Sequence, residues 1–271
     1  MILFAAAFLA AQAHQPPPPP PETDEGRAAE CQRTVRASPE AGLSLATRWV
    51  ASGGGFHARQ CAGLAFVALE RWPQAATTYE QAAQAAERAS DARAGDFWVQ
   101  AGNAWLAGSQ PARAILAFDT ALASRHLTPE LRGEVRLDRA RALVAENRLP
   151  EARRDIDQAI ELVPRDPMVW YLSAALARRQ NDLARARTDI GRARELARTD
   201  PAILLLAGTI AGQAGDMGEA ERLYRQVVAS APNTDAGRAA AESLATIRDV
   251  EVAAPPSPTT PPPPAGQRPQ D

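Results

Sequence analysis

The sequence predicts an all-α fold, and three observations support this prediction. Strand-type alternation of apolar and polar residues is almost absent between the two proline-rich ends of the chain. Apolar residues instead recur at spacings of three and four, which is the period of an amphipathic helix. Turn-forming residues separate these segments, as in QNDLARA at 180–186 and GDMGEA at 215–220. We therefore expect a series of helices joined by tight connections.

The helical segments contain an internal repeat. In five places an alanine is followed four residues later by a large apolar residue, which is Tyr79, Phe118, Ile156, Ile190 or Tyr224. Twelve residues before each alanine stands a small residue, which is Gly63, Gly102, Ala140, Ala174 or Gly208. Where two helices pass closely, a small residue on one leaves room for a large residue on the other. The repeat therefore predicts pairs of packed helices.

This pattern resembles the tetratricopeptide repeat (TPR) family, whose unit of 34 residues is a pair of antiparallel helices. Residues 201–234 match it best, with Gly208, Ala220, Tyr224 and Pro232 at the family's two small positions, its aromatic position and its proline position. The resemblance implies a right-handed superhelical solenoid of antiparallel helix pairs. It places five repeats at 56–89, 95–128, 133–166, 167–200 and 201–234.

The chain departs from the family pattern at the residue before each small position of the first helix. This residue is usually leucine in the family, and here it is Ala62, Ala101, Arg139, Ser173 or Ala207. Alanine is frequent throughout this chain. The joint spacing of glycine, alanine and aromatic residues therefore supports the resemblance better than the alanines alone.

Both ends of the array need caps, because each repeat buries its face only against a neighbour. Residues 25–55 are expected to form a degenerate repeat or N-terminal cap, in which Ser38 caps a helix and Gly53–Gly55 make a turn. Residues 235–250 are expected to form a capping helix at the other end. Its N-cap would be Thr234 or Asp235.

The two ends of the sequence predict export and extended spacers. An apolar run from Ile2 to Leu9 precedes Ala11 and Ala13, the small-x-small spacing of a signal-peptidase site, so residues 1–13 are expected to be a signal peptide. The protein would then be periplasmic or secreted, in a Gram-negative bacterium. Residues 14–24 and 251–271 are rich in proline, and we expect a disordered linker and a disordered tail.

The composition argues against several kinds of chemistry. The net charge is −2 and every one of the 30 basic residues is arginine, so mechanisms that require a lysine are excluded. Nothing favours nucleic acid as a partner, and no later apolar run is long enough to span a membrane. His57 and Cys61 have zinc-ligand spacing without a third ligand. We therefore expect a protein that is not an enzyme and holds no cofactor or metal.

Two features leave alternatives open. Cys31 and Cys61 fall on the first helices of adjacent repeats, where they could form a disulfide in an oxidising compartment or remain two buried free thiols. The run ARARTDIGRARELAR at 184–198 could bind an anion, or it could be the solvated outer face of a helix.

The family resemblance also implies a site. The first helices of TPR units line a concave groove that binds peptide segments, and we expect a protein or peptide partner there, with Tyr171 as an anchor. Transferred onto this chain, the groove residues are Gln60, Leu64, Val99, Gln100, Asn103, Leu137, Asp138, Arg141, Tyr171, Leu172, Arg178, Leu205 and Thr209. Relatives that clamp a chaperone's terminal carboxylate use lysine there, and the absence of lysine and the presence of Glu134 and Asp138 argue against that ligand.

These observations predict a non-enzymatic scaffold of the bacterial periplasm that holds a partner segment in its groove. The alternative is a constitutive structural subunit of an envelope enzyme or assembly complex. The sequence does not identify the partner, because TPR specificity lies in groove side chains that follow no simple code.

Overall fold

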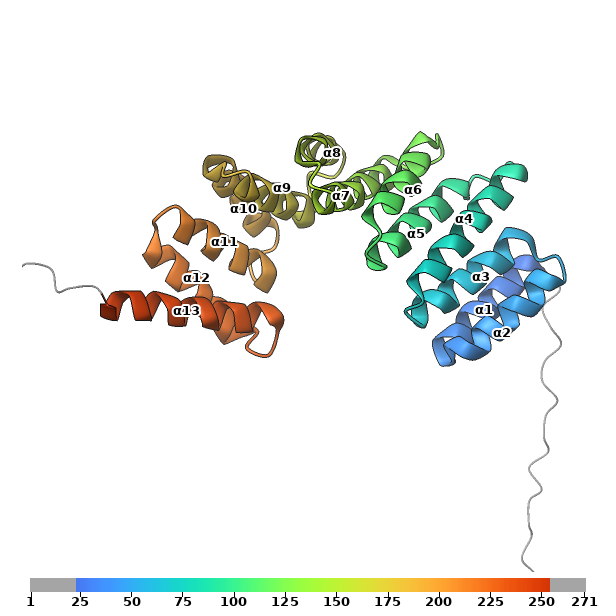
Figure 1. Cartoon of the computed structure of the whole chain (residues 1–271), viewed down its shortest axis with the longest axis horizontal. Helices are drawn as coiled ribbons and strands as arrows, with labels where there is room; N and C mark the ends of the chain where they lie inside the picture. The colour runs from blue at the N-terminus through green and yellow to red at the C-terminus, as the bar shows by residue number, and fades with distance from the viewer. Residues whose placement is uncertain (1–22, 254–271) are drawn as a thin grey trace, which may run out of the picture. The chain divides into compact units, whose positions relative to one another are not determined.

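A computed structural model describes residues 23–253 of the chain. This part forms thirteen α-helices and contains no β-strand, as the sequence predicts (Figure 1). The chain divides after Leu127 into two units, each described below by itself. The expected signal peptide and most of the two proline-rich segments lie outside the described residues. Among residues 23–253, no helix combines the length and apolar character needed to cross a membrane.

Unit 1 contains the first six helices. They are α1 (Asp24–Ala37), α2 (Pro39–Ala51), α3 (Gly55–Ala68), α4 (Trp72–Arg88), α5 (Ala94–Ala107) and α6 (Pro111–Ala123). Each helix packs against the next one along the chain, and α1 also packs against α3. The expected repeats at 56–89 and 95–128 coincide with the pairs α3–α4 and α5–α6.

Unit 2 contains the other seven helices. They are α7 (Pro129–Ala145), α8 (Leu149–Leu162), α9 (Pro167–Arg179), α10 (Leu183–Leu196), α11 (Pro201–Gln213), α12 (Met217–Ser230) and α13 (Asp235–Ala253). Consecutive helices again pack together. The pairs α9–α10 and α11–α12 lie within the expected repeats at 167–200 and 201–234, whereas α7 begins at Pro129, before the start of the expected repeat at 133–166.

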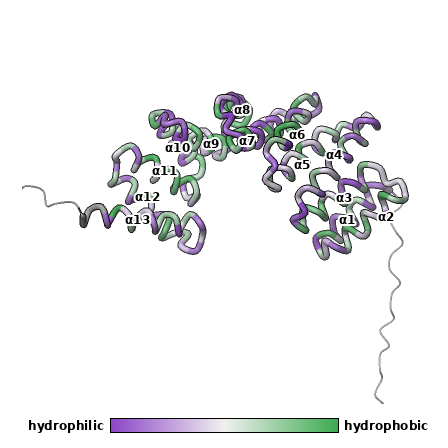
Figure 2. The backbone as a smooth tube through the Cα atoms, viewed as in Figure 1, coloured by the Kyte–Doolittle hydropathy of each residue, from purple (hydrophilic) through white to green (hydrophobic). Residues whose placement is uncertain are grey.

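The helices begin where the sequence provides caps. The Ser38 hydroxyl accepts a hydrogen bond from the Ala41 amide (3.3 Å), and Pro39 occupies the first turn of α2. Thr234 caps α13, because its hydroxyl accepts from the Gly237 amide (3.1 Å). Hydrophilic and hydrophobic residues are mixed along the helices, as amphipathic segments require (Figure 2).

The helical region is slightly longer than expected at both ends. Asp24, assigned to the linker, is the first residue of α1, because Thr23 provides a cap by accepting a hydrogen bond from the Gly26 amide (3.0 Å). Helix α13 continues to Ala253, three residues beyond the expected end of the capping helix at residue 250. The sequence 251–253 contains no proline, so nothing in its backbone stops the helix there.

Close contacts between glycine and aromatic residues hold three of the helix pairs together. A Cβ atom placed on Gly63 would lie 2.6 Å from Tyr79, one on Gly102 would lie 2.5 Å from Phe118, and one on Gly208 would lie 2.7 Å from Tyr224. Carbon atoms do not approach this closely, so the aromatic ring occupies the volume that a side chain would need. The predicted packing of Tyr224 and Phe118 into these gaps is confirmed.

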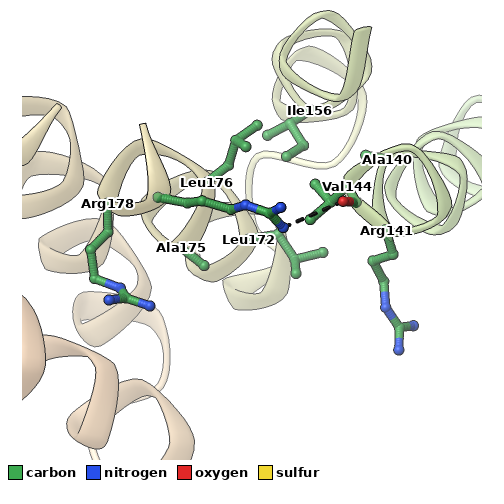
Figure 3. A pocket seen from close by; sticks show the side chains of 9 residues that line it. Ala140, Arg141, Val144, Ile156, Leu172, Ala175, Leu176 and Arg178 are labelled. Carbon is green, nitrogen blue, oxygen red and sulfur yellow. Dashed lines mark hydrogen bonds between the residues drawn. The ribbon is translucent and has the colours of Figure 1, made fainter. Parts of the chain in front are cut away.

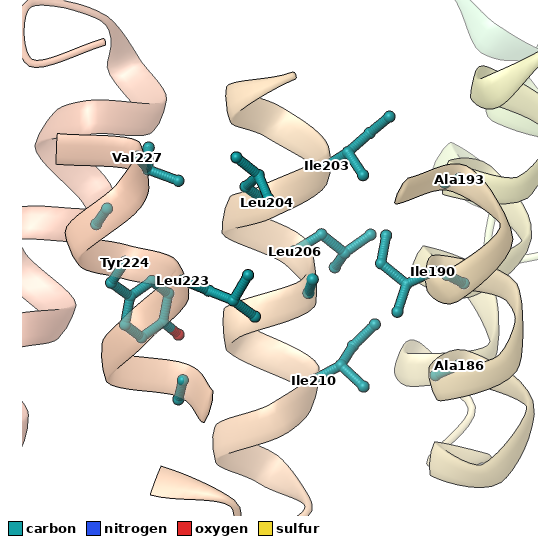
Figure 4. Packing of buried hydrophobic residues seen from close by; sticks show 14 of the residues in the cluster. Ala186, Ile190, Ala193, Ile203, Leu204, Leu206, Ile210, Leu223, Tyr224 and Val227 are labelled. Carbon is teal, nitrogen blue, oxygen red and sulfur yellow. The ribbon is translucent and has the colours of Figure 1, made fainter. Parts of the chain in front are cut away.

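The core of unit 2 is continuous from α9 to α12. Helix α11 directs Ile203, Leu206 and Ile210 toward α10 and Leu204 toward α12 (Figure 4). All four side chains are buried. A helix that is apolar on opposite faces has a neighbour on each of them, which is how a stacked array makes one core from many helices.

A disulfide joins α1 to α3 at the start of unit 1. Cys31 and Cys61 form this bond with their Cα atoms 5.9 Å apart, and both residues are buried. In the chain-entropy model, a bond that closes a loop of about 30 residues stabilises the fold by roughly 3 to 4 kcal/mol. It ties the N-terminal cap to the first repeat.

Candidate functional site

A cavity of about 550 Å³ lies in unit 2, where α7, α8 and α9 meet. We call it the α7–α9 pocket. It is lined by Ala140, Arg141, Val144, Ile156, Leu172, Ala175, Leu176, Arg178 and Arg179. Figure 3 shows Arg141 and Arg178 pointing away from Ile156 on different sides of this space. The pocket therefore combines an apolar lining with basic groups.

The pocket is apolar at its deepest point. Ala140, Ile156 and Leu176 are at most 3% exposed, and Leu172 and Val144 are half-buried beside them. Ala140 and Ile156 stand at the repeat positions that hold glycine and an aromatic ring in the pairs α3–α4, α5–α6 and α11–α12. Isoleucine is smaller than tyrosine or phenylalanine. The site can therefore accept an aliphatic group from a ligand.

Two arginines of the pocket come from the last turn of α9. This helix begins at Pro167, where the Asp166 carboxylate accepts a hydrogen bond from the Met168 amide (2.8 Å), and it ends at Arg179. Positive side chains interact favourably with the carbonyl end of a helix. The sequence thus places the consecutive residues Arg178 and Arg179 at the edge of the cavity.

The three arginines differ in their partners. Arg141 donates to the Asp138 carboxylate (3.2 Å). Arg179 donates to the Val144 carbonyl and to the Asn147 side-chain oxygen, both at 3.3 Å, so it bridges α9 and the end of α7 (Figure 3). Arg178 has a buried Nε atom with no hydrogen-bond partner among the described residues.

A network of buried polar groups supports the helices around the pocket. The Asp155 carboxylate in α8 is 3% exposed and accepts two hydrogen bonds from Arg139 (2.6 and 2.7 Å) and one from Arg136 (3.2 Å), both in α7. In the next pair, the Ser173 hydroxyl donates to the Asp189 carboxylate and accepts from Arg153 (2.9 Å). These bonds fix α7, α8, α9 and α10 relative to their neighbours.

The pocket contains three of the residues that the repeat pattern predicted for a groove, namely Arg141, Leu172 and Arg178. Tyr171 and Leu205 lie outside it; both are half-buried and pack against the core of unit 2. Asp138 and Thr209 are half-buried in the same unit. In unit 1, Gln60, Leu64 and Gln100 are half-buried and Asn103 is exposed.

Two predicted groove residues are buried. Val99 is 8% exposed and Leu137 is 5% exposed, so both belong to the core and offer little surface to a partner. Val99 lies in α5 and Leu137 in α7, and each is an aliphatic residue on the buried face of its helix.

Sequence reasoning missed several lining residues. Val144 and Ala175 stand at the same repeat positions as predicted groove residues in other units, so the repeat frame contained a signal for them, and Arg179 directly follows the predicted Arg178. Ile156 and Leu176 could not be found in this way. Their positions belong to the core in this frame, and only the packing of the helices opens a space above them.

The structure also bears on the other candidate sites. The Cys61 sulfur belongs to the disulfide, so it is not available to a metal beside His57. No cluster of three potential ligands occurs among residues 23–253. Within the basic run 184–198, Arg185 pairs with Asp157 and Asp189, Arg192 with Glu195 and Arg194 with Glu219. These pairs favour the outer-face interpretation of the run.

Comparisons with known proteins agree with this architecture. The chain is similar in structure to PilF of Pseudomonas aeruginosa (16% identity, TM-score 0.64, 81% of this chain and 97% of that one). It is similar to PilW, described as a type IV pilus biogenesis factor (16%, 0.65, 80% and 98%). It is also similar to YrrB, described as a TPR protein with an unusual peptide-binding site (15%, 0.53, 73% and 97%). At such identities the likeness supports the fold alone.

The sequence comparisons identify the family. A search of curated proteins found no match. A family model described as Tetratricopeptide repeat matches residues 62–129 and 137–201, which include the small and large repeat residues of α3–α4, α5–α6, α7–α8 and α9–α10; the pair α11–α12 lies beyond the match. The chain therefore belongs to the tetratricopeptide repeat family.

Proposed function

We propose that this protein is a non-enzymatic interaction scaffold of the bacterial periplasm that binds a segment of a partner protein. The observation that carries this proposal is the α7–α9 pocket. It is lined by Arg141, Leu172 and Arg178, which the family pattern predicts to face a peptide groove. An apolar pocket bordered by a few polar groups is the usual form of a binding site.

The proposed location rests on the ends of the chain and on the cysteines. Residues 1–13 have the pattern of a signal peptide. A buried disulfide between Cys31 and Cys61 fits an oxidising compartment, because thiols are kept reduced in the cytosol. Cell fractionation with mass spectrometry of the mature N-terminus tests the location. A cytosolic chain that keeps residues 1–13 would overturn it.

Crosslinking in living cells tests the binding role. A photoreactive benzoyl-phenylalanine in place of Leu172, which lines the pocket, is expected to capture a defined partner segment. The matched control places the same group at Thr188, an exposed residue of α10 outside the pocket. Mass spectrometry of the crosslinked peptides identifies the segment. Identical products from the two positions, or no product at Leu172, would refute binding at this site.

A further inference from the structure

The charges around the α7–α9 pocket define the chemistry of the segment that it would hold, and this inference rests on the proposed function. Three arginines line the cavity, and no aspartate or glutamate does. One of the three, Arg141, pairs with the Asp138 carboxylate. Arg178 and Arg179 make no ion pair with a carboxylate among the described residues, and Arg179 donates instead to the Val144 carbonyl and the Asn147 side chain. The edge of the pocket at the end of α9 thus carries excess positive charge.

Arg178 has the strongest need of an anionic partner. Its Nε atom is buried without a hydrogen-bond acceptor in the described part of the chain. Leaving a buried donor unpaired costs about 1 to 3 kcal/mol, and more when the group is charged. The Nε atom itself has almost no accessible surface, so a ligand would meet the terminal amino groups of this half-buried guanidinium, which makes no ion pair with a carboxylate among the described residues. A carboxylate fits best, because its two oxygens match the planar fork of a guanidinium.

The apolar part of the lining favours an aliphatic group in the ligand. The side chains of Ile156, Leu172 and Leu176 offer aliphatic contacts and no hydrogen-bonding group. A segment with charges alone would leave this part of the cavity unfilled. An aliphatic side chain would occupy it and gain free energy in proportion to the apolar area buried.

We infer that the partner segment carries an aliphatic anchor residue with aspartate or glutamate within a few positions of it. The anchor enters the α7–α9 pocket above Ile156, and the carboxylate pairs with Arg178 and its neighbour Arg179. The arginines of unit 2 provide this specificity, although the family resemblance suggested a groove of mixed character. The ligand is an acidic, aliphatic segment of another protein.

Selection of peptides from a random library tests this inference directly. The probe is a library of random dodecapeptides displayed on phage, selected on the immobilised full-length chain. Enriched peptides are synthesised and their dissociation constants measured for wild type and for Ala175→Phe, which narrows the pocket and keeps all three arginines. The expected consensus has Leu, Ile or Val next to Asp or Glu, and Ala175→Phe is expected to weaken its binding.

Charge variants then isolate the role of Arg178. Arg178→Gln is expected to raise the dissociation constant about tenfold, because a charge-assisted hydrogen bond contributes roughly 1.5 kcal/mol or more. Arg178→Lys should restore part of the affinity by keeping the charge. Arg187→Gln removes an exposed arginine of α10 outside the pocket and should have no effect. Circular dichroism of each variant checks that the fold is retained.

The outcomes separate the two proposals. If no peptide is enriched, or if Ala175→Phe binds every enriched peptide as well as wild type does, the pocket does not bind segments and the proposed function fails. If the enriched peptides need the open pocket but lack acidic residues, or bind Arg178→Gln normally, only the acidic character is refuted. Self-association that Ala175→Phe abolishes would identify a second copy of this chain as the occupant and would also overturn the inference.

Discussion

The helix pairs α5–α6 and α7–α8 make contact at the same repeat positions but with different residues. In α5–α6, Gly102 faces Phe118, and their neighbours Ala101 and Ala117 are apolar and buried. In α7–α8, alanine and isoleucine replace glycine and phenylalanine. The two alanines of the first pair are replaced there by Arg139 and Asp155, which form a bidentate ion pair.

The pair α9–α10 packs in the same way as α7–α8, with a small residue facing isoleucine and a polar contact beside it. Ala174 and Ile190 belong to one buried cluster, and Ser173 donates a hydrogen bond to Asp189 at the positions of the ion pair. Burial also lowers the pKa of Arg153, which donates to Ser173. Helices α7, α8 and α9 of these two pairs also line the α7–α9 pocket. The polar contacts hold the helices where no large aromatic ring does so, and space for a ligand remains between them.

The largest expected effect comes from breaking the buried ion pair. Asp155→Ala leaves Arg136 and Arg139 without their carboxylate, and we expect a loss of about 3 kcal/mol in the free energy of unfolding. The double variant Arg139→Ala with Asp155→Ala recreates the apolar neighbours found in α5–α6 and should be more stable than Asp155→Ala alone. Urea denaturation followed by circular dichroism measures both. Equal stability of the single and double variants would contradict this account.

A control distinguishes buried pairs from exposed ones. Glu195→Ala removes the partner of Arg192, and both side chains of that pair are about 60% exposed. Exposed ion pairs contribute about 0 to 1 kcal/mol. A loss as large as that of Asp155→Ala would show that burial is not the cause.

A smaller effect is expected from filling the glycine contact. Gly102→Ala brings a Cβ atom against Phe118, and overpacking of this kind costs about 1 to 3 kcal/mol. Adding Phe118→Ile converts the contact to the type found in α7–α8. The two changes together should therefore cost less than the sum of the single losses in a double-mutant cycle.

Gly191 is the matched control for this prediction. It lies inside α10, and a Cβ atom there would have no neighbour within 4 Å. Gly191→Ala should therefore stabilise the protein by about 0.5 to 1 kcal/mol through helix propensity. Destabilisation by both substitutions would mean that the aromatic contact is not what distinguishes them.

Ile156→Phe tests whether the residue that packs in α8 also controls binding in the α7–α9 pocket. It places an aromatic ring at the repeat position held by Tyr79, Phe118 and Tyr224 in other pairs, beside the α7–α9 pocket. Because the ring can extend into this cavity, we expect a change of less than about 1 kcal/mol in stability. Binding of the selected peptides should be lost. Unchanged binding, measured by fluorescence anisotropy, would show that the cavity is not the site of contact.

The smallest expected effect concerns an exposed ion pair of unit 1. The hydrogen bond from Arg93 lowers the pKa of Asp91 to about 2 from its ordinary value of 3.8. A depressed pKa means that the pair stabilises the fold above pH 4 and that this contribution disappears as the pH falls toward 2. Exposed pairs contribute at most about 1 kcal/mol. Asp91→Asn should therefore be slightly less stable than wild type at pH 5 and equal to it below pH 2.

The sequence predicted the helices well because their signals are local. The cap residues Ser38 and Pro39 lie at the start of the helix that they define. Gly208 and Tyr224 lie within the one helix pair that their contact holds together. The site was predicted only in part. The repeat places Leu172 and Arg178 at the pocket, whereas Val99 and Leu137 are buried, because burial depends on tertiary packing that the repeat does not encode.

The sequence by itself determined the all-α class, the pairing of helices and the family, because a regular spacing of small and large residues repeats whatever the details of packing. Tertiary structure alone decided where a cavity opens and which arginines lack an acidic partner. Both depend on distances between residues far apart in the chain, such as Arg179 and Asn147, which lie 32 positions apart and share a hydrogen bond. Periodicity can place a residue on a helix face, but only packing determines what lies opposite that face.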